Sequence, residues 1–284
     1  MSFRVIVALS FLASLAHGGG GTRKNPSHGK KPLPPAIPRT DYGDFVYGSK
    51  KGPPVTMIFN VTKEGRGMFE IDCGGSSFRD GWFSLRRENE TDDPHDEILH
   101  EFSGPEASRR TRWLEEIRKK CPQVTLGDWD FESFSVGESG NVEVEFSGNN
   151  IVLRRQWLAL NPGRYLSNSS TSHFRMLYDV QEGGFVHVKL GCKAVDGYPA
   201  GETEWKSYQL VREGPGKPYS LTPTTSRDRV RDLFDSFNRA CYVWRDSFDF
   251  AEDFKMVRFA TPDIMFAFGM YTFDRLYRHP FQTV

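Results

Sequence analysis

The chain repeats itself at a spacing of about 120 residues, and this self-similarity constrains the fold more than any other feature of the sequence. Three segments of the first half align with three of the second: residues 55–61 with 174–180, 69–73 with 188–192, and 83–88 with 208–213. Apolar and polar side chains alternate along these segments, which is the pattern of strands with one buried face. The sequence therefore predicts two similar halves that each begin with three strands.

An apolar stripe of helical spacing follows the three predicted strands in each half. In the second half the stripe consists of Val230, Leu233, Phe234, Phe237 and Cys241. In the first half the matching residues are Arg110, Trp113, Leu114, Ile117 and Cys121. Spacings of three, four and seven residues place these side chains on one helix face. Further matches follow, of residues 130–131 with 253–254 and of 141–146 with 263–268, and a closing strand is predicted at 151–155 and at about 272–277.

This order of elements predicts an α+β fold. Each half is expected to be an antiparallel sheet of βββ-α-βββ order with one helix packed on it, so that the protein consists of two tandem homologous halves. The predicted organisation is a signal peptide at residues 1–18, a flexible basic arm rich in proline and glycine at 19–41, a first repeat at 42–160 and a second repeat at 161–284.

The predicted signal peptide has the three parts of a secretory leader. Arg4 precedes an apolar run at residues 5–15, and small residues that suit a signal peptidase follow. No other apolar run in the sequence approaches the ~18 residues that cross a bilayer, so we expect no membrane span. The sequence therefore predicts a secreted, extracellular protein.

Four cysteines recur at matched positions in the two halves. Cys73 and Cys192 end matched strands, and Cys121 and Cys241 end the matched helix stripes. Because each strand and helix pair is expected to pack face to face, we predict the disulfides Cys73–Cys121 and Cys192–Cys241. Zinc is the alternative use of four cysteines, but the sequence has no C-x-x-C pair, and an oxidising compartment favours disulfides.

Three N-x-S/T sequons suggest a glycoprotein. They begin at Asn60, Asn89 and Asn168, whereas Asn25 is followed by proline and is excluded. Sequons also arise by chance, and the strand position of Asn60 makes it the weakest candidate of the three.

The sequence offers no recognisable catalytic or cofactor motif. It has no G-x-S-x-G elbow, no H-E-x-x-H pair and no phosphate-binding glycine loop. His95 and His100 lie in an acidic stretch at residues 92–101, but their spacing does not put both rings on one helix face, so we expect a solvated loop instead of a metal site. The matched acids Asp130 and Asp253 could pair as in a glycosidase, but sequence does not give their separation. We therefore predict no catalytic residue, no metal site and no cofactor.

Charge and aromatic content bear on the partner. Lysine plus arginine and aspartate plus glutamate each number 37, so no charge excess indicates a nucleic acid. Tryptophan is favoured at binding sites, but the first expectation is that five of these residues fill the junction of the halves and cover the helices. They are Trp82, Trp129, Trp157, Trp205 and Trp244.

The resulting functional hypothesis is a secreted, disulfide-bonded, glycosylated binding protein without catalytic activity. Its expected partner is an extracellular or host-surface protein or carbohydrate. Two alternatives remain open: a secreted hydrolase with a site at the junction of the halves, and a carrier of a small apolar ligand that the many phenylalanines would enclose.

Overall fold

The computed structural model describes residues 42–50, 52–86, 98–102, 104–137, 139–168, 172, 174–195, 197–225, 228–244, 253–269 and 272–279. The predicted leader and arm, Asn89 and His95 lie outside these residues. The first sheet consists of β1 (Gly43–Gly48), β2 (Thr56–Val61), β3 (Arg66–Asp72), β4 (Ser77–Ser84), β5 (Ile98–Glu101), β6 (Ser133–Val136), β7 (Val142–Phe146) and β8 (Asn149–Arg155). The second consists of β9 (Gly163–Ser167), β10 (Phe174–Val180), β11 (Phe185–Cys192), β12 (Gly201–Glu202), β13 (Lys206–Arg212), β14 (Tyr219–Pro223), β15 (Met256–Thr261), β16 (Ile264–Gly269) and β17 (Thr272–His279).

The described residues form two α-helices, one associated with each sheet: α1 (Ala107–Lys120) and α2 (Val230–Ala240). Short 3-10 turns lie at Gly104–Glu106, Glu182–Gly184 and Tyr242–Trp244. None of the described helices is long and apolar enough to cross a membrane.

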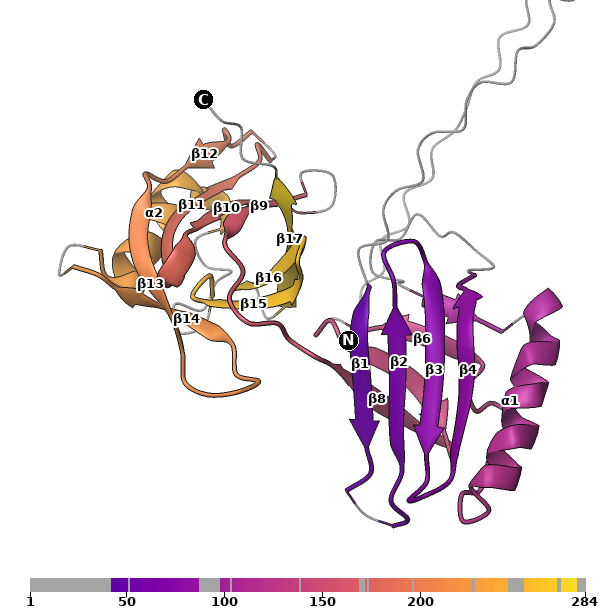
Figure 1. The fold of residues 1–284 in the computed structure, drawn as a ribbon. Coiled ribbons are helices and arrows are strands. Elements are labelled where there is room, and N and C mark those ends of the chain that lie inside the picture. The colour runs from indigo at the N-terminus through magenta and orange to yellow at the C-terminus, as the bar shows by residue number, and fades with distance from the viewer. Residues whose placement is uncertain are drawn as a thin grey trace, which may run out of the picture. The chain divides into compact units, whose positions relative to one another are not determined.

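The first sheet is a half-barrel of eight strands in the order β4-β3-β2-β1-β8-β7-β6-β5. Each strand pairs antiparallel to its neighbour, and α1 lies beside β4 (Figure 1). Its two end strands, β4 and β5, do not form a ladder with one another in the described residues. Two hydrogen bonds connect the chain there: Glu101 N–H donates to Arg86 O, and Arg86 N–H donates to His100 Nδ1.

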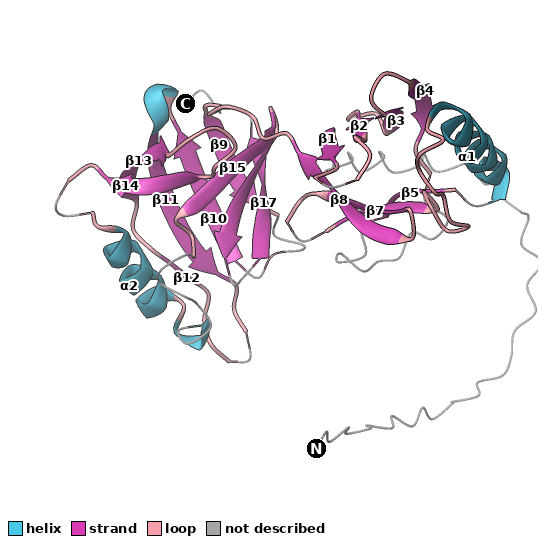
Figure 2. Cartoon of the chain, turned by 90° about the horizontal axis from the view of Figure 1, so that it is seen from below, coloured by secondary structure: helices cyan, strands magenta, loops and turns pink. Residues whose placement is uncertain are grey.

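The second sheet closes into a barrel. Its order is β10-β9-β17-β16-β15-β14-β13-β11-β12, and the additional pairing of β10 with β11 completes a ring of eight strands, to which β12 is attached. Figure 2 shows these strands wrapping around with α2 on the outside. We call this closed sheet the second barrel. Closure leaves the ring without unpaired edge strands.

The predicted α+β fold of βββ-α-βββ order is wrong, because the protein is mostly β. The difference comes from strands that the sequence pattern does not reveal. β1 and β9 precede the first matched strands, and β5 and β14 precede the helices. With them, the strands on each side of the helix form a continuous up-and-down meander that curls into a half-barrel or a barrel instead of a flat sheet under a helix.

The order of strand pairing is the same in both sheets, except that β13 pairs with β14, whereas β4 and β5 form no ladder in the described residues. Reading from the strand before the first matched segment, β1-β2-β3-β4 corresponds to β9-β10-β11-β13, and β5 to β8 correspond to β14 to β17. The pairing of β1 with β8 is repeated by β9 with β17. The two-residue strand β12 is the addition in the second barrel.

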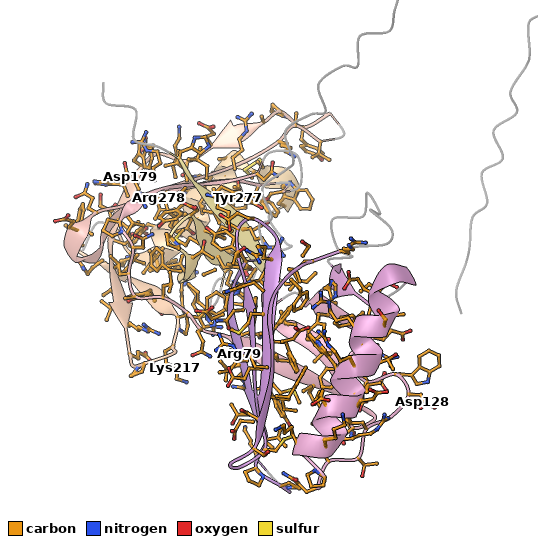
Figure 3. The ribbon with its side chains drawn as sticks, turned by 45° about the vertical axis from the view of Figure 1, so that its right-hand side comes forward. Arg79, Asp128, Asp179, Lys217, Tyr277 and Arg278 are labelled. Atoms are coloured by element: carbon orange, nitrogen blue, oxygen red, sulfur yellow. A yellow bond between two sulfur atoms is a disulfide. The ribbon has the colours of Figure 1, made fainter. Side chains whose placement is uncertain are left out.

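The core of the first sheet is built around Trp113 of α1. Its indole stacks on Phe69, with ring centroids 4.4 Å apart, and its Nε1–H donates to Asp80 Oδ2 at 2.7 Å. Asp80 also accepts hydrogen bonds from Arg109 and Arg112 of the same helix. Arg79, the neighbour of Asp80 on β4, projects from the side of the sheet away from α1 (Figure 3), as strand alternation requires.

The second barrel is filled by its own aromatic side chains. Tyr178, Tyr208 and Phe259 have no exposed surface, and the Tyr178 hydroxyl donates to Phe254 O at 2.9 Å. Burial raises the pKa of both tyrosines well above its ordinary value, so the hydroxyls stay neutral. Phe174, Phe237 and Phe254 are buried in the same core.

Candidate ligand-binding site on the second barrel

Two glycines allow β12 to lie close against the second barrel. A Cβ on Gly201 would lie 1.8 Å from the carbonyl oxygen of Ala240, at the end of α2. A Cβ on Gly191 of β11 would lie 2.7 Å from Gly201 O and 3.0 Å from Glu202 Cγ. The distances to Ala240 O and to Gly201 O are shorter than Cβ contacts in real structures, so glycine at both positions lets this short strand pass between β11 and the helix.

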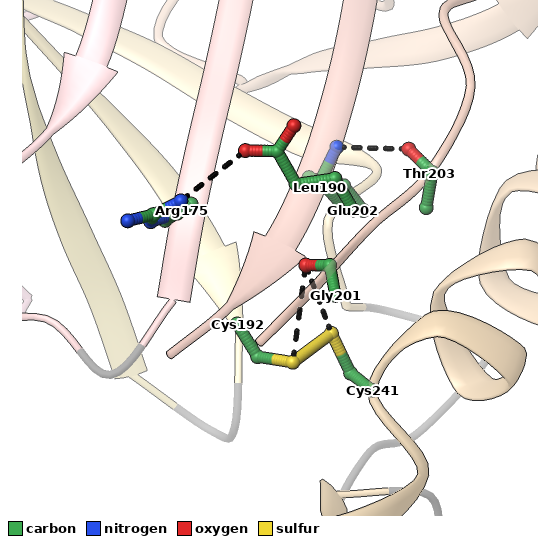
Figure 4. Close-up of a disulfide and its surroundings, with 7 residues drawn as sticks. All are labelled: Arg175, Leu190, Cys192, Gly201, Glu202, Thr203 and Cys241. Atoms are coloured by element: carbon green, nitrogen blue, oxygen red, sulfur yellow. Dashed lines mark hydrogen bonds and ion pairs between the residues drawn. A yellow bond between two sulfur atoms is a disulfide. The ribbon is translucent and has the colours of Figure 1, made fainter. Parts of the chain in front are cut away.

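The position of β12 is fixed by a disulfide and by hydrogen bonds. Cys192 and Cys241 are joined, with Cα atoms 5.8 Å apart, beside Gly201 (Figure 4). Thr203 is buried: its hydroxyl accepts the Leu190 N–H at 3.0 Å, and its own N–H donates to Leu190 O at 2.7 Å. These contacts place Glu202 on the outer face of the barrel.

Glu202 lies between two cations on that outer face. Its Oε2 is 2.6 Å from Lys189 Nζ, and its Oε1 is 3.4 Å from Arg175 Nη1 (Figure 4 shows the Arg175 contact). The hydrogen bond from Lys189 is the largest influence on Glu202 and lowers the pKa of its carboxyl, so the carboxylate stays ionised. Because one carboxylate faces two cations, this cluster has one positive charge in excess.

The cluster borders a hollow of about 370 Å³ on the outer face of β9, β10 and β11, which we call the Trp205 hollow. Its lining combines apolar and charged side chains: Leu166, Ser167, Arg175, Met176, Leu177, Lys189, Leu190, Glu202, Trp205 and His279. Leu166 and Leu177 are directly opposite each other in the pairing of β9 with β10 and form an apolar floor. A hollow of this size with an apolar floor and a few charged groups has the character of a small-ligand site.

The exposure of Trp205 in this lining differs from the burial that the sequence analysis predicted for it. Trp205 is 46% exposed, and Trp82 and Trp129 are also exposed. The expectation that these side chains fill the junction of the halves and cover the helices is wrong for these three. An exposed indole beside charged groups is typical of binding surfaces.

Both disulfides have the pairing that the sequence pattern predicts. Cys73 is bonded to Cys121, and Cys192 is bonded to Cys241, so each bond joins the end of a strand to the end of a helix. No free cysteine occurs in the chain. Only the second disulfide lies beside the Trp205 hollow, because only the second sheet has β12.

The sequons differ in their surroundings. Asn60 lies on β2 and is partly buried, and its Oδ1 is shielded from solvent. Asn168 follows the end of β9 and is also partly buried.

The acidic stretch of the first half is not a solvated loop throughout. Its end forms β5, in which Leu99 and His100 are completely buried, so the solvated-loop expectation is wrong there. Among the described residues, no group of three or more histidine, cysteine, aspartate or glutamate side chains is arranged to hold a metal ion.

Asp130, considered above as half of a carboxylate pair, has a structural role. It is buried, and its carboxylate accepts backbone N–H groups from Gly127, Ser147 and Gly148 at 2.8–3.1 Å. These bonds hold the turn before β6, where Phe131 adopts a positive φ of 59°.

The sequence analysis did not identify the residues of the Trp205 hollow. Strand alternation does place Arg175 and Leu177 on one face of β10, and Lys189 on the same side of β11. Glu202 and Trp205, however, reach this face through the fold-back of β12, which no periodic pattern marks. No family model, curated protein or solved structure matches this chain.

Proposed function

We propose that this chain is a secreted, glycosylated binding protein without catalytic activity, and that the Trp205 hollow binds an acidic sugar of an extracellular glycoconjugate. The observation that carries the proposal is the excess positive charge of Arg175 and Lys189 over Glu202 beside an apolar floor and an exposed indole.

Three features of the chain support an extracellular location. The chain has two disulfides, and disulfides form and persist in oxidising compartments. The leader pattern at residues 1–18 and the sequons at Asn89 and Asn168 point to the same secretory route. Glycans at these two asparagines are part of the proposal.

An acidic sugar combines the features that the hollow can recognise. One face of a pyranose ring presents C–H groups, which pack on an indole and on leucine side chains. Its hydroxyls need donors and acceptors, which Arg175, Lys189 and Glu202 supply at the rim. Its carboxylate would be held by charge-assisted hydrogen bonds from the arginine and lysine. A neutral sugar would leave the excess cation without a partner.

Binding fits the chemistry of Glu202 better than hydrolysis does. A glycosidase needs a protonated carboxyl as general acid, with a second carboxylate at a defined distance. The pKa of Glu202 is lowered by Lys189, so this group holds no proton near neutral pH. Glu202 is also the only carboxylate among the described residues that line the hollow.

The test uses the full-length chain secreted from cultured cells, so that disulfides and glycans form. The probes are soluble polymers that carry either α-linked N-acetylneuraminic acid or β-galactose, because multivalent display makes weak affinity measurable. We expect the protein to bind the acidic polymer at least about tenfold more tightly than the neutral one.

Variants locate the binding. Trp205→Ala and Lys189→Met should each weaken binding of the acidic polymer by about tenfold or more. Trp129→Ala and Lys217→Met, which change an exposed tryptophan and an exposed lysine elsewhere, are the controls and should bind as the wild type does. Equal binding of both polymers, or loss only in the control variants, would refute the proposal.

A further inference from the structure

β1 and β8 of the first sheet pair over only part of their length. The ladder between them contains Phe45 with Arg155 and Val46 with Arg154. β1 continues to Gly48, whereas β8 begins at Asn149, so both strands extend beyond the ladder. We call the space between these extensions the β1–β8 wedge.

The backbone of β8 faces the wedge with unpaired polar groups. Gln156, directly after β8, donates its N–H to Asp44 O at 2.8 Å, so the backbone N–H and C=O of Gln156 point toward β1. Because these groups alternate along a strand, those of Arg154, Val152 and Asn150 point to the same edge. Within the described residues, Val152 and Asn150 have no ladder partner on that edge. The opposite edge of β8 is paired with β7 from Asn149 to Leu153.

A hollow that is open to solvent lies at the wedge. It has a volume of about 640 Å³ and is lined by Val46, Tyr47, Gly48, Lys50, Asn150, Ile151, Val152 and Arg154. Val152, in the unpaired part of β8, is 41% exposed. Open strand edges of this kind pair readily with an added strand, and natural proteins commonly block them unless they are used.

The charges of the wedge define what it accepts. Both charged residues in its lining, Lys50 and Arg154, are cationic, and no carboxylate is among the described lining residues. A peptide with acidic side chains would therefore complement this edge. A second copy of the chain would not, because edge-to-edge pairing of two β8 strands would bring the same cations together.

We propose that the β1–β8 wedge binds an extended acidic segment of a partner protein as an added strand along β8. Backbone hydrogen bonds to Val152 and Asn150 supply affinity, and carboxylates that reach Lys50 and Arg154 supply specificity. The unpaired part of β8 is about five residues long. Because paired strands both rise by about 3.3 Å per residue, the bound segment also has about five residues. This site is separate from the Trp205 hollow and does not depend on the function proposed for it.

The test uses the full-length protein and three synthetic peptides of about seven residues, with blocked termini, chosen to cover the unpaired edge. In the first, valine alternates with glutamate. The second has lysine in place of glutamate. The third keeps the sequence of the first, but alternate backbone nitrogens are methylated, so that charge and side chains are retained while strand donors are lost.

We expect only the first peptide to bind, and we expect it to slow hydrogen exchange of the Val152 and Asn150 amides by about tenfold or more at saturation. Lys50→Glu and Arg154→Glu should each weaken binding of the acidic peptide and favour the lysine peptide. Lys217→Glu on the second barrel is the charge-matched control. Lys50 is exposed and lies outside any strand, so its variant remains informative if Arg154→Glu fails to fold.

Three outcomes would overturn the proposal. Equal binding of the methylated peptide would show that no strand is added. Unchanged exchange of Val152 and Asn150 on binding would place the peptide elsewhere. Concentration-dependent dimerisation that protects these two amides without peptide would assign the edge to a second copy of the chain.

Discussion

Lys189 Nζ lies 2.6 Å from Glu202 Oε2, across the pairing of β11 with β12. This contact places a neutralising charge inside the Trp205 hollow, at the point where we propose that a ligand carboxylate binds. Glu202 therefore competes with that carboxylate for the same cation.

Replacement of Glu202 by glutamine is predicted to strengthen binding of the acidic sugar. An exposed ion pair contributes up to about 1 kcal/mol, so release of Lys189 and Arg175 should raise affinity by about twofold to fivefold. Binding of a neutral sugar should not improve. The measurement is a titration of both probes with the wild type and Glu202→Gln, and weaker acidic-probe binding by the variant would contradict the role given to this ion pair.

Gly201→Ala is predicted to displace β12. The new methyl group would lie 1.8 Å from Ala240 O, so β12 or the end of α2 must move. We expect a loss of about 2 kcal/mol or more in the free energy of unfolding, measured by chemical denaturation, together with loss of probe binding. Gly214→Ala, where a Cβ meets nothing within 4 Å, is the matched control.

The two disulfides are predicted to have equal effects on stability and unequal effects on binding. Each closes a loop of similar length, with separations of 48 and 49 residues, and the chain-entropy model gives about 4 kcal/mol for either. Paired serine replacements at Cys192 and Cys241 should loosen β12 and weaken probe binding. The same replacements at Cys73 and Cys121 should destabilise the first sheet and leave probe binding intact, so equal loss of binding in both would count against the site.

Asp80 is predicted to make the stability of the first sheet sensitive to acid. Burial alone would raise the pKa of this carboxyl, but hydrogen bonds from Trp113 and Arg109, with the charges of Arg109 and Arg112, outweigh it and lower the pKa below the ordinary 3.8. Because the folded pKa lies below that of the unfolded chain, the stabilisation is complete above about pH 4 and is lost as pH falls through the folded value.

Asp80→Asn should therefore cost about 1–3 kcal/mol near neutral pH and should reduce the acid dependence of unfolding below about pH 4. Denaturant unfolding at several pH values measures both effects. Glu115→Gln, an exposed change on the same helix, is the control. A variant that retains the full acid dependence of the wild type would assign that dependence to other carboxyls.

The sequence predicted both helices and the positions of β2, β3, β7, β10, β11, β13 and β16 but not the fold class, and the strand expected at residues 83–88 overlaps β4 at only two residues. Alternation marks β2, β10 and their neighbours because each has several buried side chains in a row at period two. β5 and β14 are short, and β5 lies at the end of an acidic stretch, so neither gives a clear period. The pairing of β1 with β8 joins residues more than 100 positions apart, and this long-range contact, which no local pattern encodes, makes the curved sheet.

The residues of the candidate site were harder to predict from the sequence than the elements of the fold. The cysteine pairing followed from the faces of Cys73 and Cys121, because strand and helix periods both point inward there. The Trp205 hollow depends instead on two glycines that allow a close approach of β12. A glycine in a sequence gives no sign of which backbone it will contact, so Glu202 and Trp205 could not be assigned to one surface in advance.

The most direct test of the proposed site is a titration of the ¹⁵N-labelled protein with the methyl α-glycoside of N-acetylneuraminic acid, followed in ¹H–¹⁵N spectra to about 20 mM probe, a range that detects millimolar affinity. We predict that the largest shifts are those of the Trp205 indole N–H and the Gly191 and Glu202 amides. Shifts confined to the indoles of Trp82 or Trp129, or no shifts at all, would contradict the assignment of ligand binding to the second barrel.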